Sequence, residues 1–216
     1  MMISPEAYFE GALQGQPPAV LLQRVNALRR EIARLKRKME HPFYTPRIFP
    51  SEDVRLSCTR EYLARAKQAL VAAGGACPQT AVERRDEAFN ATLDDIERIE
   101  LSIGGFLDGY GFHTVCLEDP VRYEQGFSPV LQGEEKLTET GAPVSRAEFL
   151  ALLADLHIGE WRRSYDCSQY GICVEDGTQW RVAVTYTDGR RPFVREGSNA
   201  YPHNFKAFRA LMGAGE

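Results

Sequence analysis

The chain has 216 residues, enough for one domain or two small ones and enough to bury a hydrophobic core. Its 44% apolar and 26% charged residues argue against wholesale disorder, and no apolar run is long enough to span a bilayer. The net charge of −4 divides unevenly: residues 1–75 carry 12 Lys and Arg against 7 Asp and Glu, a net of +5, whereas residues 76–216 carry 14 against 23, a net of −9.

Residues 1–76 predict an antiparallel helical hairpin. After a short N-terminal helix, we expect a long helix over 18–40 and a second one that begins at about Ser51 or Ser57 and ends at Ala73, joined by the proline-rich stretch 41–50. The first long helix carries a heptad seam of apolar residues, which indicates packing against the second helix or a homodimer through residues 21–39. The seam consists of Leu21, Val25, Leu28, Ile32, Leu35 and Met39.

The same helix has an unusual density of cations. They are Arg24, Arg29, Arg30, Arg34, Lys36, Arg37 and Lys38. Glu31 is the only acid among them. Three interpretations stay open: a solvated face, a surface that docks on an acidic protein, or a surface that neutralises nucleic-acid phosphates.

The pattern changes after the hairpin. Residues 77–95 are expected to form a linker that becomes a short helix, with the polar stretch Arg84–Glu87 facing solvent. Residues 96–216 mix strand and helix signals. We therefore predict an α+β fold, in which a small antiparallel sheet has helices packed on one face.

A β-hairpin is expected at the start of this second domain. Apolar and polar residues alternate over 96–103 and again over 112–117. The glycine-rich loop Gly104–Gly111 lies between these stretches and invites comparison with phosphate-binding loops. Such loops end in a Lys-Ser or Lys-Thr pair or open a helix, whereas a strand follows here, so the loop predicts a turn.

The remaining elements follow in chain order. We expect a strand near 121–123, an acidic loop up to residue 143, and a helix that begins at Ser145. Strand 179–186 turns at Asp188-Gly189 into a further strand. The stretch GSNAYPHNF, residues 197–205, predicts a junction between that strand and a final helix rather than an active site.

Histidines and cysteines offer little evidence for a metal or catalytic site. His157, Cys167, Cys173 and His203 would supply suitable ligands if the fold brought them together, but the C-x-x-C spacing is absent. The odd number of cysteines, five, favours reduced thiols, and His113 fits a structural role within a strand. We therefore expect no cofactor, no metal and no catalytic residue.

A second cluster of interface-forming residue types lies at Trp161, Arg162 and Arg163. Trp161 also fits the core between sheet and helices. The predicted partner-binding residues are Arg24, Arg29, Arg30, Arg34, Arg37, Lys38, Trp161, Arg162 and Arg163.

Several segments resemble a family of small proteins from gut Firmicutes and from their integrative elements and phages. These segments read MEHPFY, PSEDVRLSCTREYLARAKQALVAAGG, LSIGGFLDGYGF, LHIGEWRRSYD, DGTQW and GSNAYPHNF. The resemblance covers most of the chain. It carries no assigned catalytic residues, and it implies that the protein is cargo of a mobile element.

Our leading functional hypothesis is a cytoplasmic, non-enzymatic interaction protein that inhibits a bacterial defence system such as a CRISPR nuclease complex. The acidic body would occupy a nucleic-acid channel of the Cas nuclease or its guide-RNA complex, while the basic helix contacts another surface. The alternative is a nucleic-acid-binding accessory or regulatory protein that uses residues 24–38. We expect no membrane contact, because the apolar runs are too short to span a bilayer, and a cytoplasmic location, because the first ten residues do not resemble a signal peptide.

Overall fold

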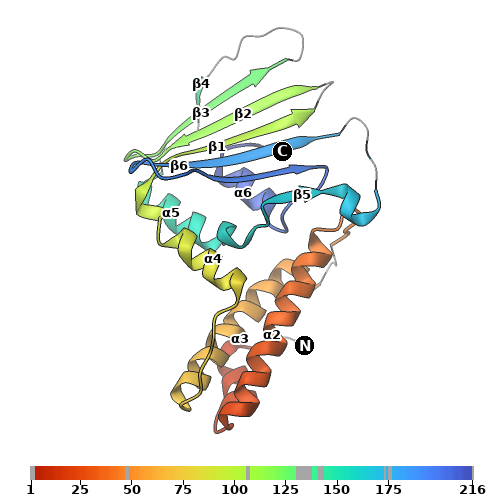
Figure 1. Cartoon of the computed structure of the whole chain (residues 1–216), viewed down its shortest axis with the longest axis vertical. Helices are drawn as coiled ribbons and strands as arrows, with labels where there is room; N and C mark the ends of the chain where they lie inside the picture. Colours follow the sequence, from red (N-terminus) through yellow and green to blue (C-terminus); the bar gives the residue numbers. More distant parts are fainter. Residues whose placement is uncertain are drawn as a thin grey trace. The chain divides into compact units, whose positions relative to one another are not determined.

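The computed structural model describes residues 3–46, 49–105, 108–129, 138–140, 144–172, 174 and 177–215. The chain divides into two compact units, Met1–Gln79 and Thr80–Glu216, which we call the N-terminal and C-terminal units. Helices make up the first unit, and the second combines a sheet with helices (Figure 1). The predicted α+β class is therefore confirmed.

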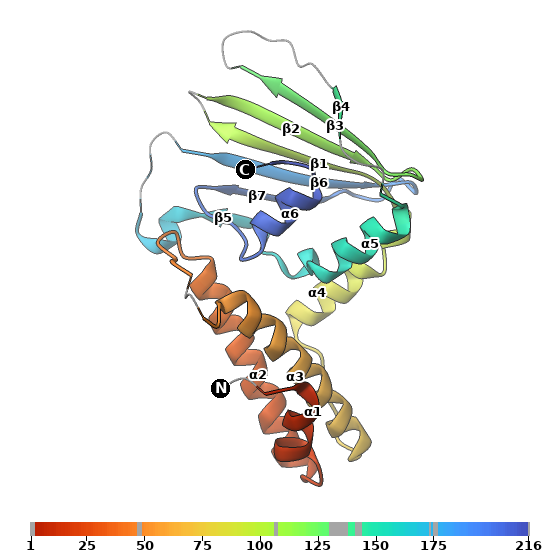
Figure 2. The same cartoon turned by 180° about the vertical axis from the view of Figure 1, so that it is seen from behind.

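The N-terminal unit is a helical hairpin with a short helical start. Helix α1 (Pro5–Tyr8) continues into a π-helical turn, Phe9–Leu13, and is followed by α2 (Pro18–Met39) and α3 (Glu52–Ala72). Helices α2 and α3 lie side by side in both views (Figure 2). Ser51 caps α3 by accepting a hydrogen bond from the backbone N–H of Val54, which satisfies a donor that the first helical turn leaves unpaired. The two predicted long helices are confirmed.

The predicted seam of α2 forms the core of this hairpin. Val25 and Leu35 are fully buried within a single chain, whereas Leu28 and Ile32 are half-buried at the edges of two small apolar clusters. The α3 residues that meet the seam include Leu56 and Leu70. These contacts bury much of the seam within the hairpin and leave Leu28 and Ile32 partly accessible, so a homodimer through residues 21–39 stays a prediction.

The C-terminal unit contains a seven-stranded sheet in the order β4-β3-β2-β1-β6-β7-β5. The strands are β1 (Ile96–Gly105), β2 (Gly109–Cys116), β3 (Arg122–Ser128), β4 (Thr138–Thr140), β5 (Ser164–Asp166), β6 (Gln179–Tyr186) and β7 (Phe193–Ser198). Neighbouring strands are antiparallel except β5 and β7, which are parallel. The prediction of an acidic loop after residue 123 was wrong in part, because β3 runs to Ser128 and Thr138–Thr140 forms β4. The rest of that predicted loop, residues 130–137 and 141–143, lies outside the described residues.

Helices cover one face of this sheet. They are α4 (Ala81–Asn90), α5 (Arg146–Asp155) and α6 (Phe205–Leu211), with short 3-10 turns η2 (Leu93–Asp95), η3 (Ile158–Glu160) and η4 (Cys167–Tyr170). The labelled helices of this unit lie on the same side of the strands in both views (Figures 1 and 2). The expected one-sided helix layer is therefore confirmed.

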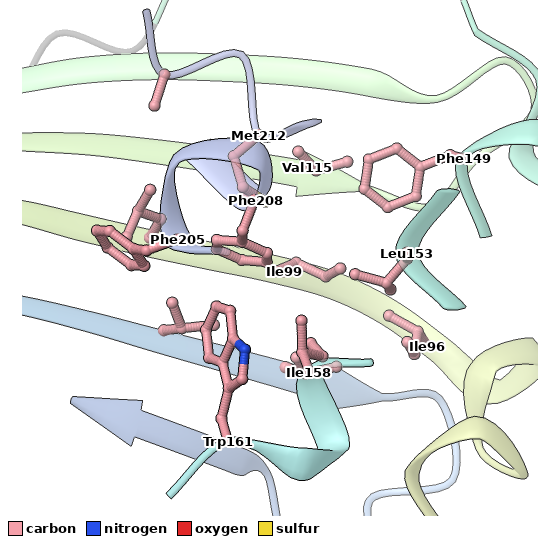
Figure 3. Packing of buried hydrophobic residues seen from close by; sticks show 14 of the residues in the cluster. Ile96, Ile99, Val115, Phe149, Leu153, Ile158, Trp161, Phe205, Phe208 and Met212 are labelled. Carbon is pink, nitrogen blue, oxygen red and sulfur yellow. The ribbon is translucent and has the colours of Figure 1, made fainter. Parts of the chain in front are cut away.

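Strand alternation directs one set of side chains into the core between sheet and helices. Ile99 of β1 pairs in register with Val115 of β2 and Val184 of β6, and all three are fully buried. Phe149 of α5 and Phe208 of α6 close this core from the helix side (Figure 3). The prediction of half-buried strands is correct here, because the alternate residues of β1 point away from the helices.

The glycine-rich loop is a hairpin turn, as predicted. Gly105 of β1 pairs with Gly109 of β2, so the strands continue through the glycines; residues 106 and 107 lie outside the described part. Gly104 has a steric role as well. A Cβ at this position would lie 2.0 Å from the carbonyl oxygen of Gly109, which no side chain tolerates.

The stretch GSNAYPHNF is a strand-to-helix junction, as predicted. Asn199 adopts a left-handed conformation with φ of 51°, and its Oδ1 accepts a hydrogen bond of 2.8 Å from the backbone N–H of Thr178. The amide of Asn204 bridges two other segments: its Oδ1 accepts a hydrogen bond from the indole of Trp161, and its Nδ2 donates one to the carbonyl of Leu156. These polar residues therefore hold the junction to its surroundings.

Candidate anion-binding site

Five arginines line one cavity of the C-terminal unit. Arg85 comes from α4, Arg163 from the segment before β5, Arg190 and Arg191 from the turn between β6 and β7, and Arg195 from β7. We call this feature the arginine cavity. Its volume is about 450 Å³, and its apolar wall includes Phe89, Tyr186 and Phe193.

Local structure explains why these arginines converge. A capping box between Thr80 and Glu83 begins α4 and places Arg85 in the second turn of the helix. In the β6–β7 turn, the carboxylate of Asp188 accepts hydrogen bonds from the backbone N–H and the Nε of Arg190. The carbonyl of Arg163 accepts a bond of 3.3 Å from the backbone N–H of Glu196, which attaches the segment before β5 to β7.

Arg195 is the most confined cation of the cavity. Its Nε donates to the carbonyl of Trp161 at 3.2 Å, its Nη1 donates to the carbonyl of Val194 at 2.8 Å, and its guanidinium carbon lies 3.7 Å from the centre of the Phe193 ring. Burial lowers the pKa of Arg195 to about 10, and the charges of Arg85 and Arg163 act in the same direction. The group stays charged at neutral pH, at an electrostatic cost.

Most of the other cavity arginines also lack a counterion. Among the residues that the structure describes, Arg85, Arg163, Arg191 and Arg195 form no ion pair. Arg190 is the one cavity arginine that a described residue neutralises, through Asp95 at 2.6 Å and Asp188 at 2.5 Å. Four positive charges around one cavity repel one another, and a bound anion would relieve that repulsion.

Guanidinium groups have a defined ligand preference. Each presents a planar fork of N–H donors that matches the oxygens of a phosphate or a carboxylate. Several forks around one cavity suit a ligand with several anionic oxygens. The arrangement can therefore bind and orient phosphate groups.

The structure distributes the predicted partner-binding residues of α2 over several roles. Arg34 forms a two-pronged ion pair with Glu31, with both distances 2.7 Å, and Lys38 contacts the buried carboxylate of Glu52 at 2.5 Å. Arg29 donates to the carbonyl of Pro78 at 2.9 Å. These three residues therefore make contacts within the N-terminal unit.

The other three predicted cations of α2 are exposed. Arg30 and Arg37 are seven residues apart and share one face of the helix, whereas Arg24 lies on a different face. Arg34 is also exposed, although it is paired with Glu31, and Lys38 is 37% exposed. The basic surface over residues 24–38 therefore stays a prediction.

The second predicted cluster, Trp161 to Arg163, also separates. Trp161 is 1% exposed and packs edge-on against Trp180, so its indole belongs to the core and its prediction as a partner-binding residue was wrong. Arg162 lies over the ring of Tyr165 at 4.3 Å and contacts Gln169. Arg163 is the one member of this cluster that lines the arginine cavity.

Four cavity residues were missed in the sequence, although a signal for two of them was present. The pair Arg190-Arg191 directly follows the predicted Asp188-Gly189 turn, which places both at the tip of a hairpin. Arg195 and Arg85 had no such signal. Their approach depends on how α4 packs near β7, which no local pattern shows.

The structure describes three of the four histidines and cysteines that were considered as metal ligands: His157, Cys167 and His203. Cys167 is a buried free thiol, and Cys173 lies outside the described residues. Within the described part of the chain, His157 shares a group of possible metal ligands with Asp86 and Glu160, and neither Cys167 nor His203 belongs to it. The prediction that Asp86 faces solvent on α4 was wrong, because this residue is only 8% exposed.

Comparisons with known proteins found no match, so the arginine cavity is the main evidence for a function. No family model matches the chain, and no curated protein or solved structure is similar to it. The resemblance to proteins of gut Firmicutes and their mobile elements therefore stays a prediction. In the described residues, no helix has both the length and the apolar character needed to cross a membrane.

Proposed function

We propose that this protein is a nucleic-acid-binding protein that holds phosphate groups of the nucleic-acid backbone in the arginine cavity. The observation that carries this proposal is the presence of four arginines without a described counterion around a single cavity. The sugar-phosphate backbone of a nucleic acid supplies anionic oxygens from successive phosphodiesters, which a single carboxylate ligand does not.

The class of function agrees with the alternative drawn from the sequence, but the surface is different. The basic helix was expected to contact nucleic acid, yet Arg29, Arg34 and Lys38 are engaged within the N-terminal unit. The arginine cavity lies in the C-terminal unit, whose overall charge is negative. The negative charge of the rest of the unit repels nucleic acid, so we expect nucleic acid to be attracted only at the positively charged cavity.

The test measures binding of a fluorescently labelled RNA oligonucleotide and of its DNA counterpart by anisotropy over a range of salt concentrations. The variant Arg85→Gln/Arg191→Gln removes two cavity charges that make no described ion pair, so folding should be preserved. We expect at least a roughly tenfold loss of affinity, and a salt slope reduced by about 1 for each phosphate contact removed.

The matched control is Arg30→Gln/Arg37→Gln, which removes the same charge from α2. We expect nearly unchanged binding for this variant. If the α2 variant loses affinity and the cavity variant does not, the basic helix is the binding surface. If neither oligonucleotide binds the wild-type protein, the proposed function is wrong.

Inhibition of a CRISPR nuclease complex stays a prediction with its own test. Purified protein would be added to a reconstituted nuclease and guide-RNA complex, and cleavage of target DNA would be followed. Loss of cleavage with wild-type protein but not with Arg85→Gln/Arg191→Gln would connect the two hypotheses. Unchanged cleavage at saturating protein would exclude inhibition of that nuclease.

A further inference from the structure

A buried carboxylate and two neighbouring residues form a second chemically distinctive group in the C-terminal unit. Asp86 lies on α4, Glu160 belongs to η3, and His157 immediately precedes η3. One potential ligand atom of each residue lies within 4.8 Å of those of the other two. Asp86 is buried, and the other two are half-buried and accessible from solvent.

The close approach of η3 to α4 assembles this group. A Cβ on Gly159 would lie 2.7 Å from the Cα of Asp86 and 3.0 Å from the carbonyl oxygen of Arg85, so only glycine allows the two backbones to meet. His157 adopts a left-handed conformation with φ of 50° as the chain leaves α5. The turn thereby places His157 and Glu160 on either side of Gly159, next to Asp86.

The carboxylate of Asp86 is only half satisfied. Its Oδ2 lies 2.7 Å from the Nδ1 of His157. Its Oδ1 is buried and has no hydrogen-bond partner. Buried carboxylate oxygens without a partner are rare in folded proteins, and an ion or an ordered water is a common explanation for them.

We propose that Asp86, His157 and Glu160 bind a divalent transition-metal ion of the Zn²⁺ type. An imidazole favours zinc and its neighbours in the first transition row over Mg²⁺ and Ca²⁺, which prefer oxygen ligands alone. Two carboxylates balance the charge of the ion, and the ion gives the Oδ1 of Asp86 the partner that it otherwise lacks. Three protein ligands leave at least one coordination position for water or for an oxygen of a bound molecule.

Titration calorimetry of the chelator-treated full chain with Zn²⁺ tests the site, in buffer that keeps the cysteines reduced. We expect one ion per chain for the wild type. Glu160→Gln removes the charge of a half-buried ligand and keeps the size of the side chain, and we expect it to lower the affinity at least about tenfold. Asp86→Asn should lower the affinity further. The neighbouring Glu87→Gln is the matched control, and its affinity should equal that of the wild type.

Cobalt provides a second readout that identifies the ligands. Co²⁺ bound by imidazole and carboxylates absorbs in the visible range, whereas thiolate ligation adds an intense near-ultraviolet band. We expect the visible bands alone, and their loss in Glu160→Gln. The proposal is overturned if the wild type binds no stoichiometric ion, if Glu160→Gln and Asp86→Asn bind as tightly as the wild type, or if the thiolate band appears.

Discussion

Replacing Lys38 by Met tests whether this residue is a structural counterion or an exposed contact for a partner. The side chain of Glu52 is fully buried, with Lys38 Nζ 2.5 Å from its Oε1 and the hydroxyl of Tyr44 donating to its Oε2 at 2.8 Å. Met keeps the aliphatic length of Lys and removes the charge. The substitution therefore isolates the ion pair.

The expected destabilisation is about 2 kcal/mol. Removing one partner of a fully buried ion pair costs about 3 to 5 kcal/mol, because the other charge stays buried without compensation. Here Lys38 is 37% exposed, so part of its interaction is already screened by water. Tyr44 continues to donate to Glu52 in the variant, which lowers the cost further.

The assay can separate the two units of the chain. Both tryptophans, Trp161 and Trp180, belong to the C-terminal unit, so their fluorescence follows its unfolding alone. Far-ultraviolet circular dichroism in urea also reports α2 and α3 of the N-terminal unit. We expect Lys38→Met to shift the dichroism transition and to leave the fluorescence transition in place.

Two comparisons decide the outcome. Arg37→Met removes an exposed charge one residue away, and its free energy of unfolding should change by no more than about 0.5 kcal/mol. The double variant Lys38→Met/Glu52→Gln should recover part of the loss, with a coupling energy of at least about 1 kcal/mol. Equal effects of Lys38→Met and Arg37→Met would refute the reasoning and return Lys38 to the set of candidate partner contacts.

Two further predictions concern pH and packing. Burial, followed by the hydrogen bond to Glu52, raises the pKa of Tyr44 to about 12 from its ordinary value of 10. Between these two pH values the folded state therefore keeps the Tyr44 proton while the unfolded state loses it. The N-terminal unit should lose stability as pH rises from 10 to about 12, and Tyr44→Phe should weaken that loss in urea titrations. Gly159→Ala should destabilise the C-terminal unit by about 1 to 3 kcal/mol, measured by tryptophan fluorescence in urea, because backbone atoms of α4 occupy the space of the new methyl group. Gly215→Ala, with no neighbour within 4 Å, should leave that transition unchanged, and equal effects of the two substitutions would contradict the packing argument.

The helices and most strands were predictable because their signals are local. The α2 seam repeats with helical spacing, Pro18 and Ser51 mark helix starts, and the alternation over Ile96–Gly105 has the period of a strand. The Asp188-Gly189 turn similarly specified a hairpin. Each signal lies within one element or one tight turn.

The candidate sites were less accessible, since their members lie far apart in the chain. Arg85 and Arg195 approach one cavity from α4 and β7, and Asp86 meets His157 across 71 positions. A sequence shows which residues carry charge, but not which charges share a counterion. Trp161 illustrates the error that results: it has the residue type of an interface, yet it is 1% exposed and belongs to the core of its own unit.

The sequence by itself determined the α+β class, the helical hairpin, the glycine-rich turn and the junction at GSNAYPHNF, because backbone preferences and apolar periodicity act over a few residues. Only the tertiary structure decided which cations are neutralised, which carboxylate is buried and where four arginines remain without a described counterion. Burial and charge pairing depend on distances between elements, and packing sets those distances.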